Sequence, residues 1–176
     1  MVNAVGRDFD DQPHEWSADV VERSAIRRWL EPLEFDCALH YDPEAARAHG
    51  YVDILVPVAA LPTFSLPPMW RPGETLFTSA DRDAQPPSPL RGLQAGLEPP
   101  TTGFIVTDLE YEYLRPVVVG DRLSRRGARL LSCTPKETSV GRGAFIVWST
   151  NIINQHGEVV ACTQTNYFRY NPHSRP

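Results

Sequence analysis

The C-terminal half of the sequence is a succession of strand-forming segments, and this feature most limits the folds open to the chain. Segments rich in β-branched and aromatic residues follow Thr101, with turn residues between them. They are GFIVTDLEYEYLRP, RLSRRGARLLSCT, GAFIVWSTNIIN and EVVACTQTNYFRY. A Gly-Asp pair at 120–121 and a Gln-His-Gly run at 155–157 mark turns, and Pro116 ends the first strand. Long consecutive strands joined by short turns predict an antiparallel sheet.

The N-terminal half carries two helix signals. In ERSAIRRWLEPL the apolar residues recur at helical spacing, Ser24 is a candidate N-cap, and Pro32 is expected to end or bend the last turn. In DPEAARAHG we expect Asp42 to cap a short second helix and Gly50 to terminate it. Helices followed by a run of strands predict an α+β domain.

Length and composition favour an ordinary globular protein. The chain has 176 residues, 41% hydrophobic and 22% charged, with a net charge of −5. No apolar stretch approaches a bilayer span, and the mild acidity argues against a nucleic-acid partner. The N-terminus lacks the basic start and apolar segment of a secretory signal. Cys37, Cys133 and Cys162 are odd in number and lack metal-ligand spacing, which predicts reduced thiols in a cytoplasmic protein.

We predict a single domain over residues 1–176, with a flexible segment at 1–15 and a long loop insertion at 66–101. Nine of the 17 prolines lie between Pro62 and Pro100, so little regular structure fits there. A loop this long inside a compact domain often serves as a lid or a binding segment.

Three strings, in this order, carry a resemblance to a known family. They are LHYDPEAARAHGY, YEYLRPVVVGDRL and GRGAFIVWSTNIINQHGEVVACT. The chain thereby resembles the MaoC-like hydratases and dehydratases of N-terminal type, the FAS1-like dehydratase domain, over roughly residues 20–170. The resemblance implies a hot-dog fold, in which a curved antiparallel β-sheet wraps around a central helix. It further implies an acyl substrate on coenzyme A or acyl carrier protein, no metal or redox cofactor, and a homodimer or a heterodimer with another hot-dog subunit.

The resemblance also assigns a catalytic residue. Hydration of an α,β-unsaturated thioester needs a base for water, an acid for the α-carbon and donors for the thioester oxygen, and a His–Asp pair suits the proton transfers. His40 matches the family histidine, but the position five residues before it, where the family has Asp, is Phe35. Asp36 stands one residue closer, and in a helix such a slip turns the side chain by about 100°. We predict that His40 is the general base and that Asp36 assists; the alternatives are a hydrogen-bonded interfacial histidine and a surface carboxylate.

Further residues are candidates for substrate binding. Phe64, Met69 and Trp70 lie near the start of the proline-rich loop and are predicted to line an apolar acyl tunnel. Gly141, Arg142 and Gly143 lack the strand–loop–helix context of a phosphate loop, and a bend entering a strand accounts for them. By the resemblance they can also approach the pantetheine arm of the carrier.

Three functions remain open from the sequence. The first is an enoyl-thioester hydratase or (3R)-hydroxyacyl dehydratase that uses His40 and Asp36. The second is a non-catalytic acyl-binding subunit of a heteromeric hydratase, whose partner supplies an intact Asp/His pair. The third is a hot-dog thioesterase, in which an Asp or Glu acts with water.

Overall fold

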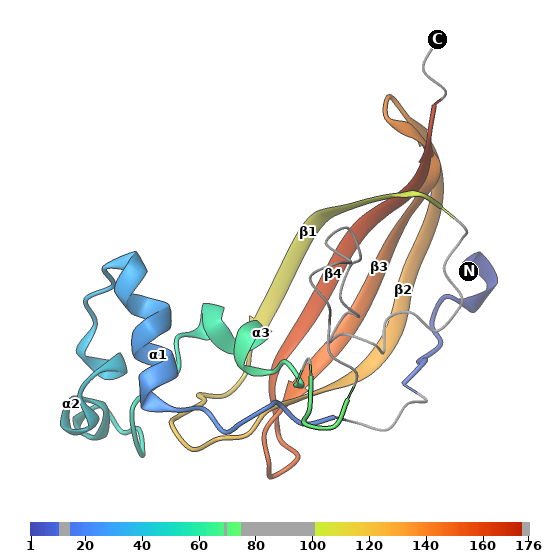
Figure 1. The fold of residues 1–176 in the computed structure, drawn as a ribbon. Helices are drawn as coiled ribbons and strands as arrows, with labels where there is room; N and C mark the ends of the chain where they lie inside the picture. Colours follow the sequence, from blue (N-terminus) through green and yellow to red (C-terminus); the bar gives the residue numbers. More distant parts are fainter. Residues whose placement is uncertain (11–14, 69, 75–100, 174–176) are drawn as a thin grey trace.

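Four long strands form one antiparallel sheet in the computed structural model, which describes residues 1–10, 15–68, 70–74 and 101–173 (Figure 1). The strands are β1 (Gly103–Tyr113), β2 (Ser124–Thr138), β3 (Gly141–Ile153) and β4 (Val159–Pro172). Their spatial order is β1-β4-β3-β2, so β2, β3 and β4 form a meander and β1 pairs with the last strand. The antiparallel sheet expected from the sequence is therefore confirmed, with β1 and β2 as its edges.

Local irregularities accompany the curvature of the sheet that Figure 1 shows. The register shifts between Val106 and Asp108 in β1 and between Arg126 and Arg129 in β2. Such bulges bend a strand and increase its twist. Pro135 lies within β2 opposite Ala144, which an edge strand tolerates because its outer N–H groups need no partner strand.

The helices are short and lie at one end of the sheet (Figure 1). Helix α1 (Arg23–Leu30) gives way to a 3₁₀ turn, η2 (Glu31–Leu33), which contains Pro32, as expected. The N-cap of α1 is Glu22, and the prediction of Ser24 was wrong. Ser24 lies inside the helix, where its hydroxyl donates to the Glu22 carboxylate at 3.2 Å and so leaves the helical N–H groups uncapped.

Helix α2 (Pro43–Ala48) has the two ends predicted from the sequence. The Asp42 carboxylate accepts a hydrogen bond from the Glu44 N–H at 2.8 Å. At the other end Gly50 has a φ of +88°, a conformation that glycine adopts without a Cβ penalty. Three 3₁₀ turns complete the helical elements described besides α3: η1 (Val2–Ala4), η3 (Ala38–His40) and η4 (Val58–Ala60).

The helical element against the sheet is α3 (Leu61–Phe64), which is a single turn. Arg125 of β2 donates hydrogen bonds to the Pro62 carbonyl and the Ser65 hydroxyl, so α3 is attached to the sheet. The α+β class and the curved sheet are confirmed, and the helical element attached to the sheet here is the single turn α3. Prolines 67 and 68 follow closely, and they cannot continue the hydrogen bonding of a helix.

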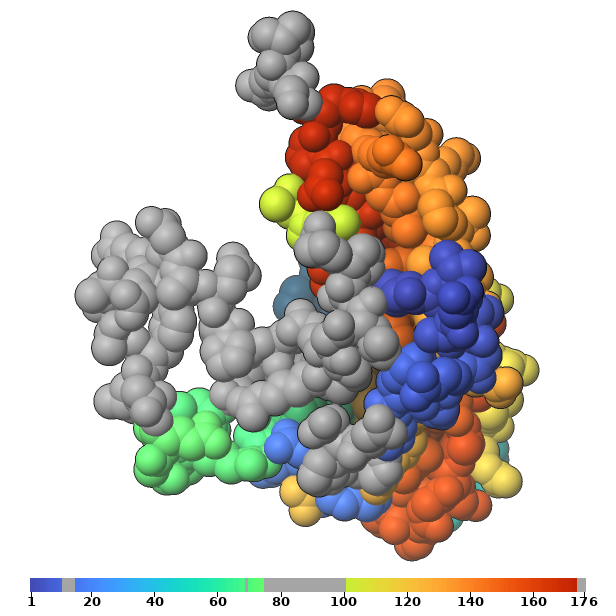
Figure 2. All heavy atoms as spheres, turned by 90° about the vertical axis from the view of Figure 1, so that its right-hand side faces the viewer, coloured from blue at the N-terminus to red at the C-terminus, as the bar shows by residue number. Residues whose placement is uncertain are grey.

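Two hydrophobic clusters form the core. One joins α1, α3 and the 54–56 segment to the helical end of the sheet, around Ile26, Leu61 and Ile152. The other lies on the sheet farther from the helices, around Trp148, and includes Phe9. Residues 1–10 of the segment expected to be flexible thus run along β2, as Figure 2 shows in blue.

Candidate functional site

His40 lies at the end of η3, directly before α2, with its ring partly buried. Its Nδ1 is 2.7 Å from the backbone carbonyl oxygen of Leu55. A carbonyl oxygen only accepts, so this contact assigns the proton of the neutral imidazole to Nδ1. Nε2 then carries a lone pair and has no hydrogen-bond partner among the described residues. The arrangement presents the form of histidine that can take up a proton.

The carbonyl that orients His40 is itself held by a strand-like contact. Leu55 pairs with Val118 in an isolated bridge, and the neighbouring Ile54 and Val56 are buried in the core. The Val118 N–H donates to the Asp121 carboxylate at 2.9 Å. The Gly120-Asp121 turn, which belongs to the motif YEYLRPVVVGDRL, therefore supports His40, which belongs to the motif LHYDPEAARAHGY. The role of Leu55 was not predicted, because every residue type has a backbone carbonyl that can accept a hydrogen bond. The residue type at this position therefore gives no signal.

Asp36 does not pair with His40 in this chain. Its side chain is exposed and makes no hydrogen bond or ion pair with the described residues. The nearest aromatic neighbour of the imidazole is Phe35, whose ring centroid lies 5.7 Å from that of His40. The Tyr41 hydroxyl donates to the Phe35 carbonyl at 3.0 Å and holds this segment. The structure thus places a phenyl ring, not a carboxylate, beside the candidate base.

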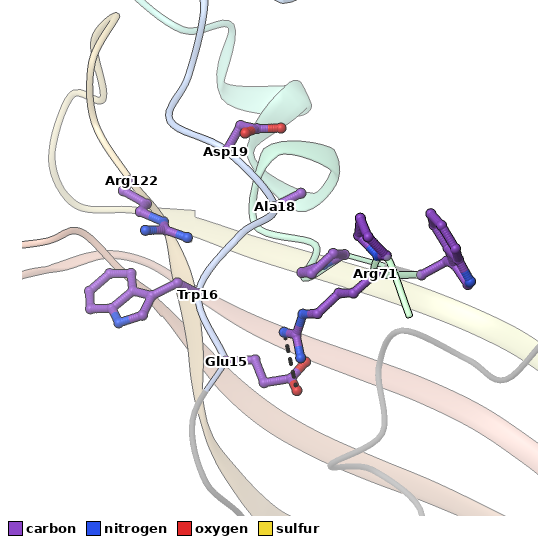
Figure 3. Close-up of a pocket in the computed structure, with 9 residues that line it drawn as sticks. Glu15, Trp16, Ala18, Asp19, Arg71 and Arg122 are labelled. Carbon is purple, nitrogen blue, oxygen red and sulfur yellow. Dashed lines mark ion pairs between the residues drawn. The ribbon is translucent and has the colours of Figure 1, made fainter. Parts of the chain in front are cut away.

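A cavity of about 620 Å³ lies between the N-terminal segment and the beginning of the proline-rich region (Figure 3). Trp70 lines it together with Trp16 and Arg122, and Arg71 reaches across to Glu15 in an ion pair of 3.6 Å. His40 and Asp36 do not line this cavity.

Phe64, another predicted tunnel residue, does not line this cavity. Phe64 is partly buried and packs against the core cluster at the helical end, and Met69 lies outside the described residues.

Gly141, Arg142 and Gly143 begin β3 at the end of the sheet away from the helices (Figure 1). A Cβ on Gly141 would meet the Asn171 carbonyl oxygen, and one on Gly143 would meet the Arg169 carbonyl oxygen. Both glycines are therefore needed for the close approach of β3 and β4, and the Arg142 side chain is exposed. Within one chain this segment is not brought to His40.

The described cysteines do not form disulfides, and burial is the main factor that raises the pKa of Cys133 and Cys162. A raised pKa lowers the fraction of reactive thiolate. In the described parts of the chain no three His, Cys, Asp or Glu side chains gather as a metal site. None of the helices described there is long and apolar enough to cross a membrane.

The architecture is that of the hot-dog folds. A chain of the ChsH1–ChsH2 complex from Mycobacterium tuberculosis superposes with a TM-score of 0.67 at 24% identity, covering 94% of this chain and 86% of that one. The MaoC-like dehydratase from Rhodospirillum rubrum gives a TM-score of 0.59 at 23% identity, with 98% and 94% covered. These similarities confirm the fold class.

The family follows from the sequence itself. Residues 3–163 match the family described as FAS1-like, dehydratase domain region, and the chain belongs to it, as the resemblance to the MaoC-like proteins predicted. A probable enoyl-CoA hydratase alpha subunit of Thermomonospora curvata is 28% identical over 178 residues, which are 95% of this chain and 53% of that protein. The chain therefore spans about half the length of this relative. A UPF0336 protein of Streptomyces avermitilis is 32% identical over 121 residues, 68% of this chain and 65% of that protein.

Proposed function

We propose that this chain acts on acyl thioesters in the hydration of an α,β-unsaturated bond, or in the reverse dehydration of a (3R)-hydroxyacyl group, with His40 as the general base. The observation that carries the proposal is the hydrogen bond from His40 Nδ1 to the Leu55 carbonyl, which leaves Nε2 as the acceptor. Membership of the dehydratase family and the similarity to an enoyl-CoA hydratase alpha subunit support the reaction class.

In hydration, Nε2 of His40 would remove a proton from water while the water oxygen bonds to the β-carbon. The electron pair of the double bond then moves toward the thioester oxygen as an enolate, and a proton delivered to the α-carbon completes the addition. The Leu55 carbonyl, which faces Nδ1–H, would stabilise the imidazolium while it carries the extra proton.

Protonation of the α-carbon is the second proton transfer, and the group that this chain offers for it, Asp36, is less well placed than His40. Asp36 assists in our proposal, but it is exposed and unpaired with His40, so it must approach when substrate or a partner binds. The position of Phe35 beside the imidazole favours a second candidate function. In that function the chain is an acyl-binding subunit, and a partner hot-dog subunit provides the complete Asp/His pair.

The test is hydration of crotonyl-CoA and longer enoyl-CoAs by the purified chain, alone and mixed with candidate hot-dog partner subunits. His40→Gln is expected to lower kcat/KM by roughly 100-fold or more, the usual contribution of a general base. His49→Gln is the matched control, because His49 also bonds a backbone carbonyl through Nδ1, at 2.8 Å, but lies exposed at the end of α2. It should leave kcat/KM unchanged.

The role of Asp36 is tested with Asp36→Asn beside Glu34→Gln, an exposed neighbour. A loss confined to Asp36→Asn supports its assistance. Activity that needs a partner subunit and survives His40→Gln would overturn catalysis by His40 and support the acyl-binding subunit. Thiol release from saturated acyl-CoAs without any hydration would support the thioesterase.

A further inference from the structure

The two edges of the sheet differ in whether the chain itself covers them. The N-terminal segment runs along the outer side of β2, where the Phe9 N–H donates to the Ala128 carbonyl and the Leu130 N–H to the Arg7 carbonyl, both at 3.0 Å. The Asp8 carboxylate also accepts from the Ala128 N–H at 2.9 Å. Strand β1 pairs with β4 on one side, and no strand of the described residues pairs with its other side (Figure 1). The open edge of the described sheet is therefore β1.

One face of this open edge is apolar. Phe104, Val106 and Leu109 project from the same face of β1 and are each roughly half exposed. The backbone N–H and C=O groups on the outer side of β1 have no partner strand among the described residues. An edge that combines unpaired backbone groups with exposed apolar side chains tends to pair with another chain. The edge of β1 therefore has the properties of a contact surface.

The other face of β1 carries an acidic row, which consists of Asp108, Glu110 and Glu112. These residues pair with alternate residues of β4, so their side chains project from one face. All three are exposed, and none forms an ion pair with the described residues. Asp108 accepts a hydrogen bond from the Asn166 amide at 3.2 Å. The described part of the chain therefore does not compensate the negative charge of the acidic row.

A second copy of this chain is a poor partner for this edge. Residues directly opposite each other in antiparallel strands project from the same face, so the acidic rows of two copies would share one face. If the two-fold axis lies beside any residue from 108 to 112, carboxylates of the two copies stand directly opposite each other. With the axis at Glu110, for example, Asp108 of one copy faces Glu112 of the other. Like charges in such positions are destabilising, and an axis nearer Gly103 would leave the acidic half of β1 unpaired.

The other edge of a second copy does not supply the missing positive charge either. Arg126 and Arg129 of β2 project from the same face of the sheet as the acidic row, as the register across the four strands shows. A head-to-tail contact between copies would bring these arginines to the acidic row. However, the N-terminal segment already pairs with the outer side of β2, and Asp8 forms a bridge with Arg129 there. Such a contact would therefore require this segment to leave the sheet.

We propose that the edge of β1 binds a different protein chain, whose own edge strand carries Lys or Arg at alternate positions opposite the acidic row and apolar residues on its other face. Opposite charges across an antiparallel pair are stabilising and like charges are destabilising, so the acidic row selects this partner over a second copy. Carboxylates that only kept an unpaired edge soluble would not account for the half-exposed apolar residues on the same strand. The inference concerns assembly and does not depend on catalysis by His40.

The probe for this partner is a charge-reversed copy of the full chain, which carries Asp108→Arg, Glu110→Arg and Glu112→Arg. Analytical ultracentrifugation with the unmodified chain fluorescently labelled measures its association with itself and with the charge-reversed copy. We expect the mixture to associate about tenfold or more tightly than the unmodified chain with itself, because each carboxylate then faces a guanidinium. The matched control reverses three exposed carboxylates outside β1 and so has the same net charge; its changes are Asp19→Arg, Glu34→Arg and Glu137→Arg. It should bind the unmodified chain no more tightly than the unmodified chain binds itself.

A neutral variant keeps the test decisive if circular dichroism shows that the charge-reversed copy does not fold. This variant carries Asp108→Asn, Glu110→Gln and Glu112→Gln, and it should associate with itself more tightly than the unmodified chain does, because the repulsion between the acidic rows is removed. Self-association of the unmodified chain that is as tight as its association with the charge-reversed copy would overturn the proposal. So would self-association that the neutral variant leaves unchanged. The hydration assay is separate, so either result leaves the role of His40 standing.

Discussion

At the scale of single residues, backbone contacts decide what the candidate side chains can do. His40 is a base candidate because the Leu55 carbonyl fixes its protonated nitrogen, and no feature of the histidine itself determines this. Asp36 stands one residue closer to His40 than the family carboxylate, and its side chain is exposed and does not pair with the imidazole. The residue types needed for acid–base chemistry are present in the sequence, whereas their pairing depends on a short loop.

The two candidate helix caps make a direct prediction about stability. Asp42→Ala should lower the free energy of unfolding by about 1 kcal/mol, because the carboxylate caps the Glu44 N–H. Ser24→Ala should change it by less than about 0.5 kcal/mol, because the Ser24 hydroxyl caps no helical N–H group. Urea denaturation followed by circular dichroism measures both. Equal losses in the two variants would contradict the assignment of Glu22 as the cap of α1.

At the scale of secondary-structure elements, the β3–β4 turn contains a carboxylate whose titration can be followed. The hydrogen bond from the Asn154 amide to Glu158, at 2.9 Å, and then the charge of Arg115 lower the pKa of Glu158 below its ordinary value of 4.5. A lowered pKa in the folded state contributes stability at neutral pH, and this contribution is lost as the pH falls through the folded-state pKa.

Glu158→Gln should therefore be less stable than the unmodified chain at neutral pH. The difference should shrink as the pH falls below 4.5, because protonation removes the same charge from the unmodified protein. Thermal unfolding across this pH range measures the effect. Glu34→Gln is the control, since Glu34 is exposed and outside the turn. A difference that stays constant with pH would contradict a lowered pKa.

At the start of β3, substitutions at neighbouring residues can distinguish a residue needed for packing, Gly143, from a candidate for carrier binding, Arg142. Gly143→Ala should destabilise the chain by more than about 2 kcal/mol, because the new Cβ would meet the backbone of β4. Arg142→Ala should leave stability within about 0.5 kcal/mol, because its side chain is exposed. If Arg142 contacts the carrier, as the sequence resemblance suggests, KM for acyl-CoA should rise in this variant. Denaturation and initial-rate kinetics on the same preparations measure the two effects separately.

At the scale of the whole molecule, the edge strand β1 exposes an apolar row. Phe104, Val106 and Leu109 are each roughly half exposed, and the pairing with β4 places them on one face. Apolar side chains gathered on an edge strand favour contact with another chain. We expect Leu109→Asp to lower the mass of the assembly that the unmodified chain forms, or to prevent its association with a partner hot-dog subunit.

Light scattering coupled to size-exclusion chromatography measures this mass. Val52→Asp is the matched control, because Val52 is 79% exposed but lies before the sheet, in the helical part of the chain. A mass that is unchanged in Leu109→Asp would contradict a contact through β1.

Much of the fold was predictable because its signals are local. The strand segments, the Gly-Asp turn and the caps of α2 depend on the conformational preferences of neighbouring residues. The pairing of β1 with β4 was not predictable in this way, since β1 and β4 are far apart in sequence and the run of strands suggests a simple meander. No length was predicted for the helix against the sheet, although the prolines that limit it are visible in the sequence.

The sequence by itself determined the strands and turns, the order of the family motifs and the presence of His40 and Asp36. Periodicity and turn chemistry are properties of neighbouring residues, so they need no knowledge of the complete chain. Only the tertiary structure decided that Phe35 lies beside the imidazole, that Leu55 orients it, and that Arg125 and Tyr113 share one row of the sheet. These contacts join residues whose proximity depends on strand register and on the path of the loops, which side-chain identity does not specify.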